Sequence, residues 1–174
     1  MSGRRRGQNG NMLKENFVRY ILLTIVLVLF SWTVLQGAEK VPAKPAPRDK
    51  CPVCGMFVYK YPDFLAEIVF RDGSVAFFDG AKDMFKYYLN MSKYNSRQKA
   101  TDIESVYVND YYSLTLVDGL KAYYVQGSDV FGPMGRELIP FEKEREAREF
   151  MKDHKGKALL KFQEITDPII KGLD

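Results

Sequence analysis

Two cysteines and a methionine lie within six residues, in the segment Cys51-Pro-Val-Cys54-Gly-Met56, and these are the only cysteines of the 174-residue chain. Thiolate and thioether sulfurs are soft donors, which select Cu(I) over harder divalent ions. A glycine at position 55 allows the backbone to turn sharply, so that the sulfur of Met56 returns toward the thiolates. The segment therefore predicts a Cu(I) site formed by Cys51, Cys54 and Met56, and a carrier of the ion rather than an enzyme.

Three other chemistries use a Cys-x-x-Cys motif, and each remains an alternative. A structural disulfide is one, although so short a loop gains little stability from closure. A thioredoxin-like redox site is another, but its first cysteine normally begins a helix, and Gly-Met-Phe-Val-Tyr is not typical of one. A structural zinc site needs four ligands, so carboxylates or a second copy of the chain would have to complete it.

Two further residues are candidate metal ligands. Met134 lies in a Gly-Pro-Met-Gly segment whose glycines permit close approach to the cysteines, although filling gaps in a core is the usual role of methionine. His154 is the only histidine, and imidazole also binds copper. The simpler interpretation is a surface histidine stabilised by the carboxyl end of a helix.

The parts needed for hydrolysis or phosphoryl transfer are missing from the sequence. It has no Gly-x-Ser-x-Gly motif, no phosphate-binding loop and no second histidine to activate a nucleophile. We therefore expect no catalytic residues and interpret the chain as a binding protein.

The net positive charge of the chain comes from its amino terminus. Residues 1–19 hold five of the 26 Lys and Arg residues and one of the 22 acidic residues, which accounts for the whole formal charge of +4. A nucleic-acid-binding protein would carry a basic surface on its folded part. We therefore expect no nucleic-acid partner.

Residues 20–38 are nineteen uncharged, mostly apolar residues, about the length of helix that crosses a 30 Å hydrocarbon layer. The preceding arginines predict that the basic tail, residues 1–19, stays in the cytoplasm. We thus expect a single-pass anchor in the cytoplasmic membrane, with the remaining chain facing the periplasm or cell exterior. A cleavable signal peptide is the alternative, and it leads to the same compartment.

The remaining chain divides into a linker and one domain. Residues 39–50 contain three prolines and no apolar periodicity, which predicts a semi-rigid linker. Residues 51–174 are long enough for a single core. In this domain, Asp72-Gly73 between two β-rich runs predicts a hairpin of 65–70 with 74–78, followed by a helix that Asp79 caps.

Later segments repeat the same kinds of element. Strands are predicted at 103–108, 112–117 and 122–125, then a glycine-rich loop at 127–136, a helix from Glu142 to about His154, and a strand at 158–165. The order predicts an α+β fold of two ββαβ units, with antiparallel sheet and helices on one side. We also expect a β-prone run at 57–59 and a turn at Asn109-Asp110.

Several spaced motifs of residues 51–174 resemble the NosL family of nitrous oxide reductase accessory proteins. They are Cys51-Pro-Val-Cys54-Gly-Met56-Phe-Val, Lys60-Tyr-Pro62, Phe77-Phe-Asp-Gly80, Tyr124-Val-x-Gly127-Ser128, Gly132-Pro-Met-Gly135 and Pro140-Phe141. The resemblance implies a fold of two ββαβ units and a membrane-attached Cu(I) chaperone that helps to assemble the copper-sulfide centre of nitrous oxide reductase. It adds that enzyme as the expected partner. A homodimer is a separate expectation and does not come from the resemblance.

The resemblance also assigns ligands. Cys54 and Met56 match the Cys-x-Met pair of the family, and Cys51 matches relatives with a Cys-x-x-Cys motif. Many members are lipoproteins, whereas this sequence has no cysteine directly after its apolar segment, so the predicted anchor is a helix.

Overall fold

The computed structural model describes residues 42–174 of the chain. The basic tail and the membrane anchor predicted at 20–38 lie outside the described residues, as does the beginning of the linker. From residue 42 onward, every helix is too short or too polar to span a bilayer.

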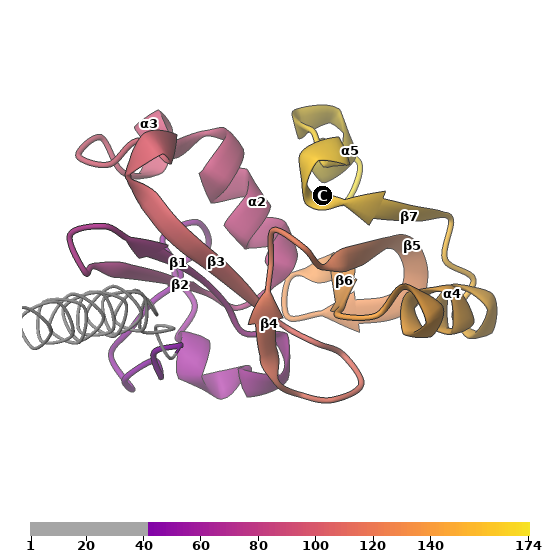
Figure 1. Cartoon of the computed structure of the whole chain (residues 1–174). Coiled ribbons are helices and arrows are strands. Elements are labelled where there is room, and N and C mark those ends of the chain that lie inside the picture. The colour runs from indigo at the N-terminus through magenta and orange to yellow at the C-terminus, as the bar shows by residue number, and fades with distance from the viewer. Residues whose placement is uncertain (1–41) are drawn as a thin grey trace, which may run out of the picture. The chain divides into compact units, whose positions relative to one another are not determined.

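Seven strands and four α-helices make up residues 42–174, and short 3-10 helices join several of them (Figure 1). The strands are β1 (Ala66–Phe70), β2 (Val75–Phe78), β3 (Ile103–Asn109), β4 (Leu116–Asp118), β5 (Tyr123–Gly132), β6 (Gly135–Phe141) and β7 (Ala158–Lys161). The helices are α2 (Ala81–Leu89), α3 (Met91–Tyr94), α4 (Glu144–Asp153) and α5 (Asp167–Lys171).

The first ββαβ unit consists of β1, β2, α2 and β3, and β4 extends its sheet in the order β2-β1-β3-β4. The predicted hairpin is present, because Gly73 adopts a φ of 85° and Asp72 accepts hydrogen bonds from the amide and hydroxyl of Ser74. After α2 the chain returns as β3, antiparallel to β1 on its other edge. The first strand of the unit is therefore central in its sheet.

The second unit, β5, β6, α4 and β7, has the same topology. Its sheet has the order β6-β5-β7, again with the first strand in the centre and antiparallel neighbours on both sides. The mixed helix and antiparallel sheet fold predicted from the sequence is therefore confirmed for residues 42–174, but the strands form two separate sheets, which lie side by side in Figure 1.

Each unit has its own cluster of buried apolar side chains. The larger cluster lies around α2 and the first sheet, where Phe85 packs edge to face against Tyr124 of the second unit. The smaller cluster lies under α4 and includes Phe141 and Phe150, whose ring centroids are 5.0 Å apart. Because Tyr124 belongs to the larger cluster, the first core extends into the second unit.

The glycine-rich segment 127–136, predicted as a loop, forms most of a long hairpin instead. Gly127 has a φ of 77°, and the β5–β6 register shifts between Gln126 and Phe131, after which pairing resumes to Gly132↔Gly135. Glycine allows such a bulge within a strand. Strand β6 was not predicted, since it contains Pro140. Proline is tolerated there because β6 is an edge strand.

Three other predictions were wrong in detail. The strand predicted at 112–117 begins only at Leu116, as β4. The residues before it form a turn in which Asp110 accepts hydrogen bonds from the amides of Tyr112 and Ser113, so the turn predicted at Asn109-Asp110 is confirmed. The run 57–59 contributes to a 3-10 helix, Val58–Lys60. The predicted strand 158–165 ends at Lys161, where a 3-10 helix, Phe162–Glu164, begins.

Candidate metal centre

The cysteine segment forms a tight loop directly before the first unit. The amide of Gly55 donates to the carbonyl of Cys51, the amide of Cys51 donates to the carbonyl of Met56, and both bonds are 2.9 Å long. Gly55 adopts a φ of 79°, a conformation that residues with a side chain rarely take, so the predicted turn at this glycine is present. The loop directs both thiols inward, with Cys51 fully buried and Cys54 half-buried.

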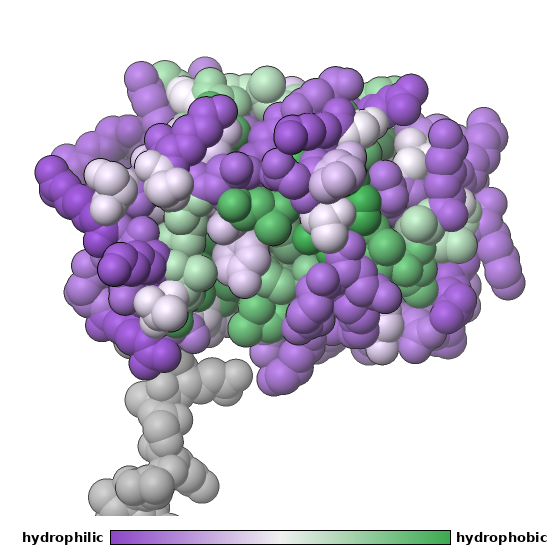
Figure 2. Space-filling model, turned by 90° about the horizontal axis from the view of Figure 1, so that it is seen from above, coloured by the Kyte–Doolittle hydropathy of each residue, from purple (hydrophilic) through white to green (hydrophobic). Residues whose placement is uncertain are grey.

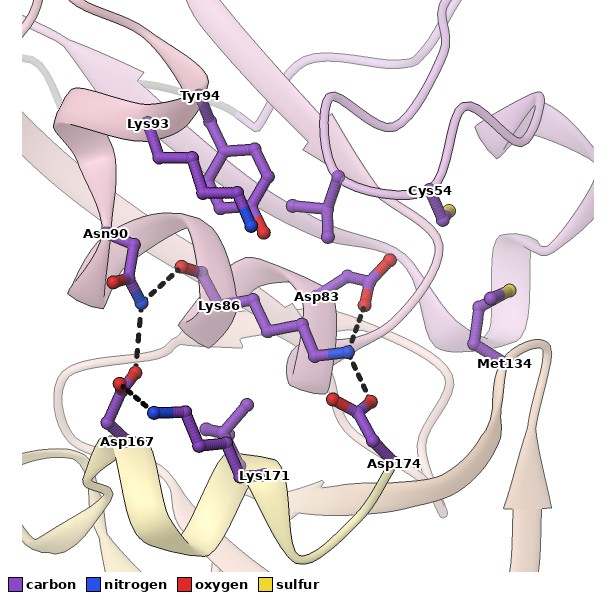
Figure 3. A pocket seen from close by; sticks show the side chains of 12 residues that line it. Cys54, Asp83, Lys86, Asn90, Lys93, Tyr94, Met134, Asp167, Lys171 and Asp174 are labelled. Atoms are coloured by element: carbon purple, nitrogen blue, oxygen red, sulfur yellow. Dashed lines mark hydrogen bonds and ion pairs between the residues drawn. The ribbon is translucent and has the colours of Figure 1, made fainter.

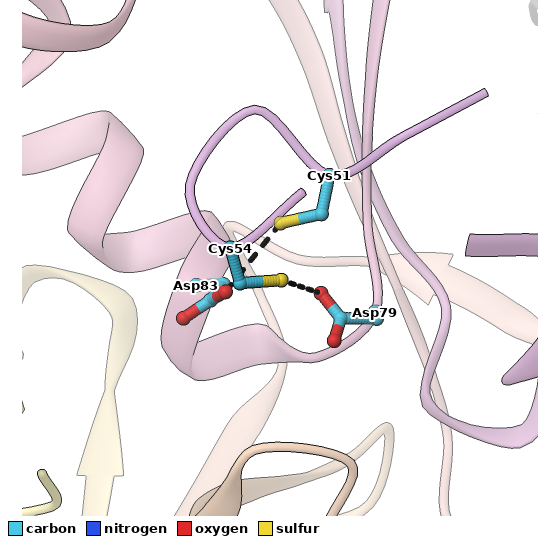
Figure 4. Close-up of side chains that lie close together, drawn as sticks. All are labelled: Cys51, Cys54, Asp79 and Asp83. Atoms are coloured by element: carbon cyan, nitrogen blue, oxygen red, sulfur yellow. Dashed lines mark hydrogen bonds between the residues drawn. The ribbon is translucent and has the colours of Figure 1, made fainter. Parts of the chain in front are cut away.

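Two carboxylates meet the thiols from the junction between β2 and α2. The thiol of Cys54 donates to Asp79 Oδ1 at 3.2 Å, and that of Cys51 donates to Asp83 Oδ2 at 3.4 Å (Figure 4). The ligand atoms of these four residues all lie within 4.8 Å of one another. The fold therefore brings two cysteine sulfurs together with two carboxylates that lie 25 or more residues later in the sequence.

The predicted helix cap at Asp79 was wrong. Helix α2 has Gly80 as its N-cap, and the side chain that accepts from an amide of its first turn is Glu137, so the carboxylate of Asp79 is available to the thiol. The second oxygen of Asp79, Oδ2, is buried and has no hydrogen-bond partner among residues 42–174. A buried acceptor without a partner costs free energy. A cation or a proton placed beside this oxygen would remove the cost, so the site fits a metal ion.

Burial sets the protonation state of both cysteines. It raises the pKa of Cys51 far above its ordinary value, and nearby Asp79 adds to the effect. Burial also raises the pKa of Cys54 to about 12, with further contributions from Asp79 and Asp83. The metal-free site therefore holds two neutral thiols, the opposite of the low-pKa thiolate that a thioredoxin-like centre requires.

A cavity of about 550 Å³ opens beside Cys54. Figure 3 shows Cys54 and Met134 at one end of it, with their sulfurs on the same side, and Lys86 crossing it to reach Asp83 and Asp174. The face on the side of α3 and α5 has hydrophobic residues at its centre and hydrophilic residues around them (Figure 2). The structure thus places a second soft donor, the predicted Met134 thioether, at the cavity that exposes Cys54.

A comparison with protein-family models assigns the chain to a family. The family model described as NosL matches residues 42–170, which is most of the sequence. The chain belongs to the NosL family. The resemblance inferred from the spaced motifs is therefore confirmed.

Two NosL proteins illustrate the relationship. The copper-binding lipoprotein NosL of Stutzerimonas stutzeri is 28% identical over 162 residues, which cover 86% of this chain and 81% of the relative. The crystal structure of the copper chaperone NosL from Shewanella denitrificans has a TM-score of 0.64 and 24% identity, and covers 74% of this chain and 98% of that one, which shows a shared fold. Both are named for copper and not for a reaction, in agreement with the prediction of a non-enzymatic protein.

The two remaining predicted ligands of this NosL member have different surroundings. Met56 belongs to the cysteine loop and is half-buried, and it is not one of the residues that line the cavity beside Cys54. His154 is the C-cap of α4, where its ring stacks on Phe150 with centroids 4.4 Å apart and its Nδ1 lies 3.1 Å from Asp129 Oδ1. The structure therefore brings Cys51 and Cys54 together, with Met134 at the adjoining cavity, but places His154 in the second unit.

Sequence reasoning missed Asp79 and Asp83 as members of the site. A signal for both was available, because they flank the start of a predicted helix and are four residues apart, a spacing that places side chains on one helical face. The Phe-Phe-Asp-Gly motif also contains Asp79. What the sequence did not reveal is that the cysteine loop folds over this junction.

Proposed function

We propose that this NosL member is a membrane-anchored chaperone that carries Cu(I) outside the cytoplasmic membrane and delivers it to a copper enzyme. The observation that carries the proposal is the convergence of the Cys51 and Cys54 thiols beside a cavity that the Met134 thioether also lines, at the same end as Cys54. These are three soft donors, as Cu(I) prefers. Membership of a family whose relatives are named for copper binding supports the same conclusion.

Cysteine binds a metal as the thiolate, so each coordinating thiol must lose its proton. Asp79 and Asp83 already accept the two thiol hydrogen bonds, and we assign to them the role of receiving or relaying these protons. Because burial raises both thiol pKa values, protons compete strongly with the ion. This competition weakens binding, which suits a carrier that must release its cargo.

The third donor in this proposal is a thioether. Met134 lines the cavity beside Cys54, whereas Met56 is close in sequence and lies outside the cavity lining. We favour Met134 and retain Met56 as the alternative. Comparing the Cu(I) affinities of Met134→Leu and Met56→Leu variants separates them, since a loss confined to Met56→Leu would overturn the preference.

The compartment and the client extend the proposal. The apolar segment 20–38 behind four arginines supports a helical anchor in the cytoplasmic membrane, and the lipoprotein name of a relative supports membrane attachment. We propose nitrous oxide reductase as the client, from the family resemblance. Cells that make this enzyme but lack the chaperone are then expected to accumulate it without its copper-sulfide centre, and full copper content would reject this client. The homodimer remains a prediction.

The central experiment is a titration of the full chain, reduced and in mild detergent, with Cu(I) against a competing chelator. We expect Cys54→Ser to weaken binding by about a hundredfold, at the upper end of what even outer-shell changes cost. His154→Ala is the matched control and should bind like the wild type, because this residue lies in the second unit. Equal affinities of the wild type and Cys54→Ser would reject the proposal.

A zinc site is the second candidate, and a specific observation favours it. Two thiols and two carboxylates within 4.8 Å provide the four ligands that a tetrahedral zinc site needs. Asp79→Asn distinguishes the two ions, since it removes a zinc ligand but leaves every soft donor in place. A loss of Zn(II) affinity without loss of Cu(I) affinity assigns the carboxylates to zinc alone.

A further inference from the structure

The tip of the β5–β6 hairpin reaches away from its own sheet toward the first unit. Its turn contains Pro133 and Met134, and 44% of the surface of Met134 is exposed. This residue and Cys54 both line the 550 Å³ cavity, as Figure 3 shows. A thioether on an otherwise exposed turn needs a fixed backbone if it is to meet a metal ion at a defined place.

Lys82 provides that fixed point. Its side chain is only 2% exposed, and its Nζ donates a hydrogen bond of 2.8 Å to the backbone carbonyl of Met134. A buried ammonium group is costly unless it is paired and hydrogen-bonded, so this bond is strongly favoured over leaving the group free. Asp174 Oδ1 lies 3.8 Å from the same nitrogen, and Glu137 is close enough to interact electrostatically.

Glu137, in strand β6 of the hairpin, also links the hairpin to α2. It is 3% exposed, and its carboxylate accepts hydrogen bonds from the amides of Lys82 and Leu138. One of its oxygens lies 2.9 Å from where a Cβ on Gly132 would be, so the hairpin closes tightly over it. The tip is thus anchored to the first turn of α2, which also carries Asp83 of the metal cluster.

We propose that Lys82 is a positioning residue that holds the Met134 thioether where it binds Cu(I) together with the cysteines. This inference rests on the proposed function and extends it to a residue that does not touch the ion. The bond goes to the backbone of Met134, so it fixes where the side chain starts. The three rotatable bonds of methionine then cover the remaining distance.

A double-mutant cycle on the full chain tests the inference. Cu(I) affinity is measured for wild type, Lys82→Leu, Met134→Leu and the double variant. We expect each single substitution to weaken binding by about tenfold, as other outer-shell partners of metal ligands do, and the double variant to be no weaker than either. Additive losses, a wild-type affinity of Lys82→Leu, or a wild-type affinity of Met134→Leu would each overturn the proposal.

A spectroscopic measurement separates positioning from general stability. With ¹³C-methyl-labelled methionine, addition of Cu(I) should shift the Met134 signal in the wild type and leave it unshifted in Lys82→Leu, whereas a Met134 shift that persists in Lys82→Leu contradicts positioning. Lys93→Leu is the matched control, because Lys93 lines the cavity but makes its contact with the Tyr94 ring. It should retain the wild-type affinity and the shift.

The design also covers a variant that does not fold and a failure of the proposed function itself. If Lys82→Leu does not fold, Lys82→Arg replaces it in the cycle, since arginine keeps a buried cation while its larger head group displaces the tip. The expected loss is smaller and still not additive with Met134→Leu, and an additive loss rejects the proposal. If wild-type binding does not depend on Cys54, the proposed function fails; if it depends on Cys54 but not on Lys82, only this inference fails.

Discussion

The helices of the two ββαβ units occupy equivalent places but bury different kinds of side chain. In α2, Lys82 and Asp83 are buried together with the apolar residues. In α4 the buried residues are Ala147 and Phe150, and the charged residues remain at the surface. Burying charge is expensive unless it is paired, so α2 carries a cost that α4 avoids. Such a cost in one of two similar units is typical of a functional site.

The junction before each helix shows the same contrast. Asp79 before α2 is buried against the thiol of Cys54, whereas Glu142 and Lys143 before α4 are exposed. The cysteine loop packs over the first junction, whereas in the second unit the connection between β3 and β4 lies there, and its buried Asp110 accepts a hydrogen bond from the amide of Glu142. The shared topology therefore places a junction before the helix in both units, and the segment that packs over this junction decides whether a functional site forms there.

The largest predicted effect concerns the two cores. Phe85→Ala and Phe150→Ala each remove a fully buried ring, one from each unit, and each should lower the free energy of unfolding by about 3 to 5 kcal/mol. Urea unfolding measures this. Among molecules that remain folded, Phe150→Ala should leave Cu(I) affinity unchanged. A loss as large as that of Cys54→Ser would mean that the second unit takes part directly in binding.

The second-largest predicted effect is on the pH dependence of stability, and it comes from a buried carboxyl group in the first sheet. Burial raises the pKa of Glu67, in the central strand β1, to about 7, while a hydrogen bond from the amide of Ala43 opposes the shift. The folded protein therefore keeps a proton that the unfolded chain loses above its ordinary pKa of about 4.5. The free energy of unfolding should fall as the pH rises through this window and then level off.

Glu67→Gln should remove this contribution and stabilise the protein at pH 8 by roughly 1 to 3 kcal/mol relative to wild type, with little difference at pH 4. Chemical unfolding at a series of pH values provides the comparison. The difference between the two proteins is the relevant quantity, because burial raises the pKa of Glu137 to about 8 and adds a dependence of the same sign to both. A pH-independent difference would contradict the burial argument.

A smaller effect tests the role of the first junction in binding. Asp79→Asn removes the carboxylate that accepts the hydrogen bond of the Cys54 thiol and adds to the effect of burial on the pKa of this thiol, so the thiolate should form at lower pH. We expect Cu(I) affinity at pH 7 to rise by about tenfold, which corresponds to one pKa unit. Glu144→Gln, in the first turn of α4, is the matched control and should have no effect. A decrease in Asp79→Asn would show that the carboxylate binds Cu(I) itself.

The smallest effect is expected on the surface of α4. Arg148 pairs with Glu144 one turn away, and both side chains are largely exposed. Solvent screens such pairs, so Arg148→Ala should cost no more than about 0.5 kcal/mol in unfolding experiments. A loss of several kcal/mol would mean that α4 depends on its charges as α2 does, and would remove the contrast between the units.

Local sequence signals predicted the elements whose cause is local. The hairpin at Asp72-Gly73, the helix at α2 and the repeated ββαβ order follow from turn residues and periodicity. Strand β6 escaped detection because Pro140 and the glycines around Met134 argue against a strand. Their tolerance depends on an edge position and a bulge, and these are properties of the assembled sheet rather than of the segment.

The residues of the metal centre also divide into those with a local sequence signal and those placed by tertiary packing. Cys51 and Cys54 were identified from sulfur chemistry and spacing alone. Asp79 was predicted to cap a helix, which is the common local role of such a residue, and its contact with Cys54 arises from tertiary packing across 25 residues. His154 was a candidate because of its residue type, and the fold places it against Phe150.

Glu137 leaves a constraint on how this sequence can change. Its carboxylate oxygen lies 2.2 Å from where a Cβ on Gly80 would be and 2.9 Å from the corresponding atom on Gly132. Two glycines more than fifty positions apart are thus held small by one acidic residue. Alanine at either position becomes acceptable only after residue 137 has become shorter, so the three positions are expected to vary together in descendants of this chain.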